Sequence, residues 1–217
     1  MKLYRHPKAF DANRMHQELK EIILERSAFT DYLFTTCLSL PAESDIYEPV
    51  RAKPINRPYA DMLQHCPYFR WLFDFFETEK VSFKLNQRGG KQLYAYHCDG
   101  VEDQFSDWVR FQIPIVTNDE VRLISTDMDN KDFDYKRFQF KGSAWNDDNA
   151  RKLEECLEAN SGRMRSNKLE AGYIYHFDVK KVHTLVNPGD TERITLLIDV
   201  VNNDWVQNYL SKLEEVV

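Results

Sequence analysis

The chain has 217 residues, of which 42% are hydrophobic and 29% are charged, and its formal net charge is −6. These values are ordinary for a globular protein and allow a sizeable core, so we expect one domain spanning residues 1–217. The net negative charge argues against a nucleic-acid partner. The sequence has no apolar run of about 18 residues, which argues against a membrane segment.

Two further features favour a cytoplasmic location. The start of the chain, from Met1 to Pro7, lacks the apolar stretch of a secretory signal peptide. The cysteines are widely spaced and form no C-x-x-C pair, so neither a disulfide framework nor a zinc site is indicated. They are Cys37, Cys66, Cys98 and Cys156.

Residues 1–79 are predicted to form a helical support. From Asp11 to Ser27 apolar residues recur at helical spacing, and Asp11 is suited to cap this helix. Residues 41–58 contain prolines at intervals, which indicates an irregular, extended connection. A second helix is predicted to begin at Pro67. It is apolar on nearly all sides as far as Phe76, so we expect it to be buried against a sheet.

Residues 80–200 are predicted to form a core of short strands. The candidate strands are Val81–Gln87, Gln92–His97, Trp108–Val116, Glu120–Thr126, Phe133–Phe140, Tyr173–Asp178, His183–Asn187 and Arg193–Val200. Arg88-Gly89-Gly90 is predicted to be a hairpin turn between the first two. A helix is predicted at Asp147–Asn160, and residues 201–217 are predicted to be a tail or helix. This pattern is typical of a mainly β, double-sheet jelly roll with helices packed outside.

His97, Asp99 and His183 follow the ligand order of the facial triad of non-haem Fe(II) oxygenases, a His-x-Asp pair and a distant His. Residues i and i+2 of a strand point the same way, so the first two can face one interior, and His183 can join them from a neighbouring strand. Two imidazoles and one carboxylate leave three metal positions for substrates. Cys98 points to the opposite face and is expected to be structural.

Arg193 follows His183 by ten residues on an apolar predicted strand. Its planar guanidinium can pair with the far carboxylate of 2-oxoglutarate, while the keto-acid end of that molecule chelates the metal and dioxygen takes the last position. Thr195 shares the face of Arg193 and can add a hydroxyl group. These residues predict an enzyme that uses Fe(II), 2-oxoglutarate and dioxygen.

Each of these residues also has a structural interpretation. A lone His or Thr in a strand often belongs to the core, and an Arg often forms a surface ion pair. A second His-x-Asp stands at His176-Phe177-Asp178, but it is too close to His183 to be the distant first element.

Parts of the sequence resemble the aspartyl/asparaginyl β-hydroxylase family. The resemblance covers residues of about 80–126 and 168–200. It rests on the stretch from Gly172 to Asn187, on Arg193-Ile-Thr-Leu-Leu-Ile-Asp199, and on Trp108-Val-Arg-Phe-Gln-Ile-Pro-Ile after the His-x-Asp. The resemblance implies a double-stranded β-helix, Fe(II), 2-oxoglutarate, and hydroxylation of an unactivated C–H of an amino acid or peptidyl residue.

The resemblance also assigns roles to two polar residues of the Trp108 stretch. It places Arg110 where a substrate carboxylate binds and Gln112 where 2-oxoglutarate binds. Because Asp99 is present, the sequence resembles most the branch that acts on free amino acids, such as the proline hydroxylases. Residues 127–167 replace a short turn of the family. We interpret them as an ordered insertion, either for substrate selection or as a subdomain remote from the site.

Two alternatives remain open. One is a jelly-roll metal- or ligand-binding module without oxygenase turnover. The other is a cupin-like isomerase or dioxygenase that uses no oxo acid, against which Arg193 argues. The expected partner is a substrate, which can be either a small molecule or a peptide, and the oligomeric state stays open.

Overall fold

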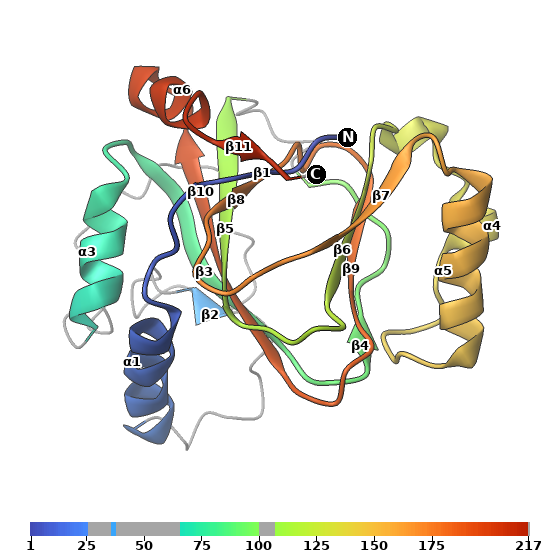
Figure 1. Cartoon of the computed structure of the whole chain (residues 1–217), viewed down its shortest axis with the longest axis horizontal. Helices are drawn as coiled ribbons and strands as arrows, with labels where there is room; N and C mark the ends of the chain where they lie inside the picture. Colours follow the sequence, from blue (N-terminus) through green and yellow to red (C-terminus); the bar gives the residue numbers. More distant parts are fainter. Residues whose placement is uncertain (26–35, 38–65, 100–106, 217) are drawn as a thin grey trace.

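The computed structural model describes residues 1–25, 36–37, 66–99 and 107–216 (Figure 1). The predicted connection at residues 41–58 and the predicted helix end at Ser27 lie outside the described residues. In chain order the helices and strands are β1 (Tyr4–Arg5), α1 (Ala12–Glu25), β2 (Thr36–Cys37), α3 (Pro67–Phe75), β3 (Lys80–Arg88), β4 (Gln92–Leu93), β5 (Trp108–Val116), β6 (Arg122–Thr126), η2 (Asn130–Asp132), α4 (Tyr135–Phe138), α5 (Asp147–Ala159), β7 (Met164–Lys168), β8 (Tyr175–His176), β9 (His183–Asn187), β10 (Arg193–Val201), α6 (Asp204–Leu210) and β11 (Glu214–Glu215). Each helix of the described segments is too short or too polar to span a membrane.

The described strands form two antiparallel sheets. The larger has the order β11-β1-β8-β5-β10-β3-β2 and the smaller the order β4-β9-β6-β7. From β3 to β10 the chain passes back and forth between the two sheets, apart from β6 and β7, which are neighbours in the smaller one. The prediction of a mainly β protein is confirmed.

The alternation of residue types along the two central strands gives each strand an apolar and a polar face. The even-numbered residues of β10 from Ile194 to Val200 are buried in the main apolar core. The odd-numbered residues from Arg193 to Asp199 point the other way, because side chains alternate along a strand. On the neighbouring strand β5, Phe111 joins the same core, whereas Arg110 and Gln112 line a cavity. The polar faces of β5 and β10 therefore lie together on one side of the larger sheet.

Helices cover the outer faces of both sheets, as predicted (Figure 1). Met15 of α1, Phe69 of α3 and Val206 of α6 pack in the core cluster that contains the apolar faces of β5 and β10. On the smaller sheet, Leu153 of α5 is buried in one cluster with Ile124 of β6. The inner faces of the two sheets are thus left to form the site.

Local interactions explain where the predicted helices begin. Asp11 accepts a hydrogen bond from the backbone N–H of Arg14 at 2.9 Å, which confirms it as the cap of α1. Glu18 of α1 is buried and accepts a hydrogen bond from the backbone N–H of Tyr68 at 2.8 Å, so it satisfies the first turn of α3. The burial predicted for α3 holds for one face, since Trp71 is 48% exposed on the other.

The predicted hairpin at Arg88-Gly89-Gly90 is wrong. β3 belongs to the larger sheet and β4 to the smaller, so the chain crosses between sheets at these residues. Glycine is required at position 90, because a Cβ atom there would lie 2.2 Å from the backbone oxygen of Asp190.

The predicted strand Phe133–Phe140 is also wrong, because this segment contains helix α4. Asp134 accepts a hydrogen bond from the backbone N–H of Arg137 at 3.0 Å and caps the helix. The phenylalanines that suggested a strand are buried against Tyr96, with ring centroids of Phe133 and Phe140 at 4.8 and 4.9 Å from its ring. The segment is ordered, as predicted. Its aromatic residues are buried because they pack on the smaller sheet and not because they belong to a strand.

Candidate metal centre

Backbone hydrogen bonds bring the three proposed ligands together. His97 and His183 form an antiparallel bridge, with N–H···O=C distances of 3.0 and 2.9 Å. Two residues later the N–H of Asp99 donates to the carbonyl oxygen of Val179 at 2.9 Å. One ligand atom from each side chain can be chosen so that all lie within 4.8 Å of one another. The grouping therefore follows from the pairing of two segments that are 86 residues apart in the sequence.

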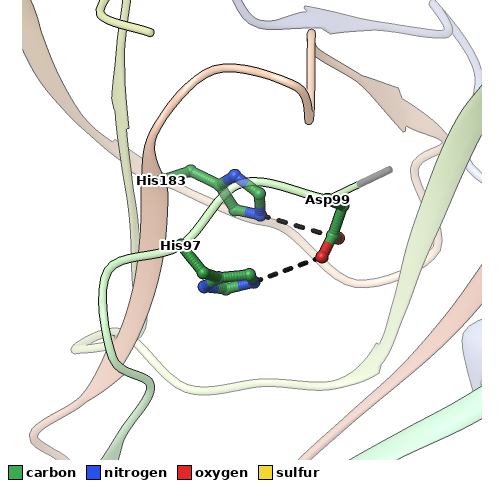
Figure 2. Close-up of side chains that lie close together, drawn as sticks. All are labelled: His97, Asp99 and His183. Atoms are coloured by element: carbon green, nitrogen blue, oxygen red, sulfur yellow. Dashed lines mark ion pairs between the residues drawn. The ribbon is translucent and has the colours of Figure 1, made fainter. Parts of the chain in front are cut away.

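The side chains of this cluster point toward one another (Figure 2). Nε2 of His97 lies 3.7 Å from Oδ1 of Asp99, and Nε2 of His183 lies 3.9 Å from Oδ2. The two imidazole ring centroids are 4.3 Å apart. Two nitrogen atoms and a carboxylate thus face one small volume, which is the donor set of a 2-His-1-carboxylate centre.

Hydrogen bonds at the other ring nitrogens select the tautomer of both histidines. Nδ1 of His97 lies 2.8 Å from the carbonyl oxygen of Ala95, and Nδ1 of His183 lies 2.9 Å from that of Lys181. A carbonyl oxygen only accepts, so each Nδ1 carries a hydrogen. In a neutral ring held in this way, Nε2 presents its lone pair toward Asp99, as in metal-binding histidines oriented by a backbone carbonyl.

The environment of His183 keeps its imidazole neutral. Burial, and next the neighbouring His97, lower the pKa of His183 to about 4. Neutral imidazole is the form that binds a metal ion, because a protonated ring has no lone pair to offer. His97 is more open to solvent, with 40% of its side chain exposed. The residues present therefore fit a divalent metal ion with access from one side.

A cavity of about 180 Å³ extends from the cluster to Arg193. Arg193 is buried, and its Nη1 has no hydrogen-bond partner among the described residues. Burial lowers its pKa to about 10, an effect that Tyr94 opposes and Arg88 increases. The guanidinium is thus still charged at neutral pH. A buried cation of this kind is strongly stabilised by an anion, which a ligand in the cavity can provide.

Gln112 and Thr195 have buried polar atoms on the same side of the larger sheet. Gln112 lines the cavity, and its Nε2 has no partner within the described segments. The hydroxyl group of Thr195 is buried and likewise unpartnered in the described structure. Thr195 lies between Arg193 and Leu197, both of which line the cavity. These atoms can donate or accept hydrogen bonds to a polar ligand that reaches this wall.

Arg110 also lines the cavity, but its guanidinium contacts two carboxylates of the protein. Nε and Nη2 donate to the two oxygens of Asp199 at 2.6 and 2.8 Å, and Nη1 donates to Oδ2 of Asp99. Burial opposes the charge of Arg110, but Asp199 and then Asp99 raise its pKa above the usual value. To bind Arg110 as predicted, a substrate carboxylate would have to compete with Asp199 and Asp99 for its guanidinium.

Sequence reasoning missed Asn86 and Tyr94, which line the cavity near Arg193. The Tyr94 hydroxyl donates to Oδ1 of Asn86, and Asn86 lies opposite Thr195 in the pairing of β3 with β10. The alternation of β3 places Asn86 on the polar face of the strand, but nothing in the sequence distinguishes it from the other polar residues of that face. The role of Tyr94 depends on the crossing between sheets and has no comparable sequence signal.

The second His-x-Asp motif is not part of the cluster. His176 lies in β8, where its Nδ1 is 3.0 Å from the backbone oxygen of Arg110. Burial lowers the pKa of His176. Cys98 packs against the apolar cluster of the smaller sheet, as expected for a structural residue, and burial raises its pKa.

Comparisons with known proteins give structural similarity without sequence similarity. No model of a protein family matches the chain, and no curated protein sequence matches it. Among solved structures, the non-heme alpha-ketoglutarate dependent carbocyclase SnoK from nogalamycin biosynthesis matches at a TM-score of 0.54 and 12% identity, over 98% of this chain and 87% of that one.

Two further structures match at a TM-score of 0.47. AviO1 from Streptomyces viridochromogenes Tue57 is 15% identical over 94% of this chain and 90% of its own. HygX from Streptomyces hygroscopicus, with nickel and 2-oxoglutarate bound, is 11% identical over 93% and 83%.

The similarity to SnoK shows that the two chains share a fold. At 12% identity it extends to the fold alone. Nothing in the comparisons points specifically to the aspartyl/asparaginyl β-hydroxylase family, so that finer assignment rests on the sequence resemblance.

Proposed function

We propose that this chain is a non-haem Fe(II)- and 2-oxoglutarate-dependent dioxygenase that hydroxylates an unactivated C–H of an amino acid or a peptidyl residue. The observation that carries the proposal is one cavity with the His97, Asp99 and His183 cluster at one end and the buried Arg193 at the other. A metal ion and a dianionic co-substrate are the ligands that this pair of features suits. The related branch of the aspartyl/asparaginyl β-hydroxylase family is part of the same proposal.

The strand order supports a double-stranded β-helix. Strands β3, β10, β5 and β8 are neighbours in the larger sheet, and β4, β9, β6 and β7 are neighbours in the smaller one. The passage of the chain between these two groups supports a jelly roll. In this arrangement residues from both sheets face one interior, which is where the cluster and Arg193 lie.

Each residue has a defined task in the proposed reaction. His97, Asp99 and His183 would hold Fe(II), and the tautomer fixed at each Nδ1 directs Nε2 to it. Arg193 would bind the far carboxylate of 2-oxoglutarate, with Thr195 and Gln112 adding hydrogen bonds. Apolar side chains of the cavity wall limit the entry of water. They are Leu123, Phe177, Val179, Leu185 and Leu197.

Bound Fe(II) and 2-oxoglutarate supply the oxidising chemistry that side chains lack. The overall reaction converts substrate C–H, dioxygen and 2-oxoglutarate into substrate C–OH, succinate and carbon dioxide. One atom of dioxygen becomes the hydroxyl oxygen and the other enters the new carboxylate of succinate. The protein contributes by orienting the C–H group and by excluding water.

A screen of free amino acids and peptides, read out as succinate formed only when a candidate substrate is added, tests the proposal. We expect coupled succinate and hydroxylated product with at least one amino acid or peptide. If Fe(II) and 2-oxoglutarate bind but no candidate gives turnover, the metal- or ligand-binding module without oxygenase activity is favoured instead. The expected substrate is a small molecule or a peptide, and the expected compartment is the cytoplasm.

A further inference from the structure

Arg110 of β5 lies between two carboxylates, one of which belongs to the metal cluster. Its Nε and Nη2 form a two-point contact with Asp199, and its remaining terminal nitrogen, Nη1, donates to Oδ2 of Asp99. The side chains of Arg110 and Asp199 are only 11% and 7% exposed. All three nitrogens of the guanidinium are therefore used by carboxylates of the protein.

The direction of this guanidinium is set by the sheet. In the pairing of β5 with β10, Arg110 lies opposite Asp199, so the two side chains project from neighbouring strands on the same face. A guanidinium is planar, and a two-point contact through Nε and Nη2 fixes the orientation of that plane. Nη1 is then directed away from Asp199 and toward Asp99.

Asp99 lies two residues beyond the bridge between His97 and His183, and its backbone N–H donates to the carbonyl oxygen of Val179 at 2.9 Å. Arg110 contacts Oδ2 of its carboxylate, which also lies 3.9 Å from Nε2 of His183, while Oδ1 lies 3.7 Å from Nε2 of His97. A carboxylate that binds a metal through one oxygen can keep a hydrogen bond at the other.

We infer that Arg110 and Asp199 form a positioning pair that holds the carboxylate of Asp99 in the orientation in which it binds the metal. This inference rests on the proposed metal centre and gives Arg110 a role different from binding substrate. Asp199 is not a member of the ligand cluster. Its printed contacts connect it to Asp99 through Arg110, which both carboxylates contact.

The test is the affinity for Mn(II) alone, measured on the full chain by the electron paramagnetic resonance signal of the unbound ion. Mn(II) suits a centre of nitrogen and carboxylate ligands and needs no co-substrate. We expect Arg110→Gln and Asp199→Asn each to weaken Mn(II) binding about 10- to 100-fold, the range known for residues that orient metal ligands. The double variant should lose no more than the worse single one, because both changes interrupt the same path.

Two further variants guard against misfolding of the neutral ones. Arg110→Lys keeps the charge but cannot form the two-point contact, and Asp199→Glu keeps a carboxylate that an extra methylene displaces, so each should recover only part of the affinity. Arg137→Gln is a matched control, because Arg137 forms an exposed pair with Glu155 at 2.8 Å and touches no ligand. It should bind Mn(II) like the parent chain.

The outcomes separate this inference from the proposed function. If the parent chain does not bind Mn(II), both the proposed centre and the positioning pair are wrong. If the parent binds but the Arg110 and Asp199 variants bind equally well, only the positioning pair is wrong. Unchanged Mn(II) affinity with a raised KM for a carboxylate-bearing substrate would return Arg110 to the substrate-binding role.

Discussion

Replacement of Arg193 by methionine is expected to weaken 2-oxoglutarate binding without destabilising the protein. Loss of one partner of a buried, hydrogen-bonded charge pair costs about 2–5 kcal/mol. At about 1.4 kcal/mol for each factor of ten, the Kd for 2-oxoglutarate should rise from about 30-fold to more than 1,000-fold. The Kd for the metal should change little, because Arg193 is not in the ligand cluster.

The stability of the same variant provides an independent check, because the substitution should weaken 2-oxoglutarate binding without lowering the free energy of unfolding. Burial lowers the pKa of Arg193 from 12.5 to about 10, which corresponds to a cost of about 3 kcal/mol to the folded protein at neutral pH. A folded-state pKa below the unfolded value means that this cost is present in full below pH 10 and is relieved as the pH rises toward 12.5. Methionine removes the buried charge, so the free energy of unfolding without 2-oxoglutarate should be unchanged or higher.

Anaerobic titration of the iron-loaded chain with 2-oxoglutarate, followed by calorimetry, measures the first effect, and urea unfolding measures the second. Arg137→Met serves as the control, because Arg137 is exposed and is not among the residues that line the cavity. A Kd for 2-oxoglutarate within about threefold of the parent value would refute the assignment of Arg193. A large loss of stability would instead show that Arg193 has a structural role.

Three other changes test separate parts of the structure. His97→Ala and His183→Ala should each lose Fe(II) binding in calorimetry while circular dichroism stays native-like; full binding by either variant contradicts the triad. Because the pKa of His183 falls to about 4 on folding, the unfolding free energy should decrease as the pH falls from 6.5 toward 4. His183→Asn should flatten that part of the urea-unfolding profile, and an unchanged slope contradicts the assignment. Phe138→Ala should destabilise the chain by about 3–5 kcal/mol in urea unfolding yet preserve metal affinity; a change in affinity would tie the insertion to the site.

The bounds of three strands and the proximity of His97, Asp99 and His183 were predictable from the sequence. β5 and β9 have the predicted bounds, and β10 extends one residue further than predicted, to Val201. Along β10 the residues of the apolar core recur at every second position, so local pattern and tertiary environment agree, whereas β9 is a short run that is buried throughout. His97 and Asp99 could be expected to lie together because they are two apart in an extended segment, and the structure adds the bridge to His183.

The remaining features depend on contacts between distant parts of the chain. The glycines after Arg88 are compatible with a hairpin, and only the sheet order shows that the chain crosses to the other sheet there. The aromatic residues near α4 suggest a strand, but Phe133 and Phe140 are buried by packing on Tyr96. The pairing of Arg110 with Asp199 requires the register of β5 with β10, which no single segment encodes.

The most direct test of the proposed centre is the visible absorption spectrum of the full chain with Fe(II) under anaerobic conditions, before and after addition of 2-oxoglutarate. A weak visible band should appear only when both are present, should be absent in His183→Ala, and should disappear on exposure to dioxygen with formation of succinate. Absence of the band in the parent chain under saturating Fe(II) and 2-oxoglutarate would contradict the assignment of His97, Asp99, His183 and Arg193 to a common oxygenase site.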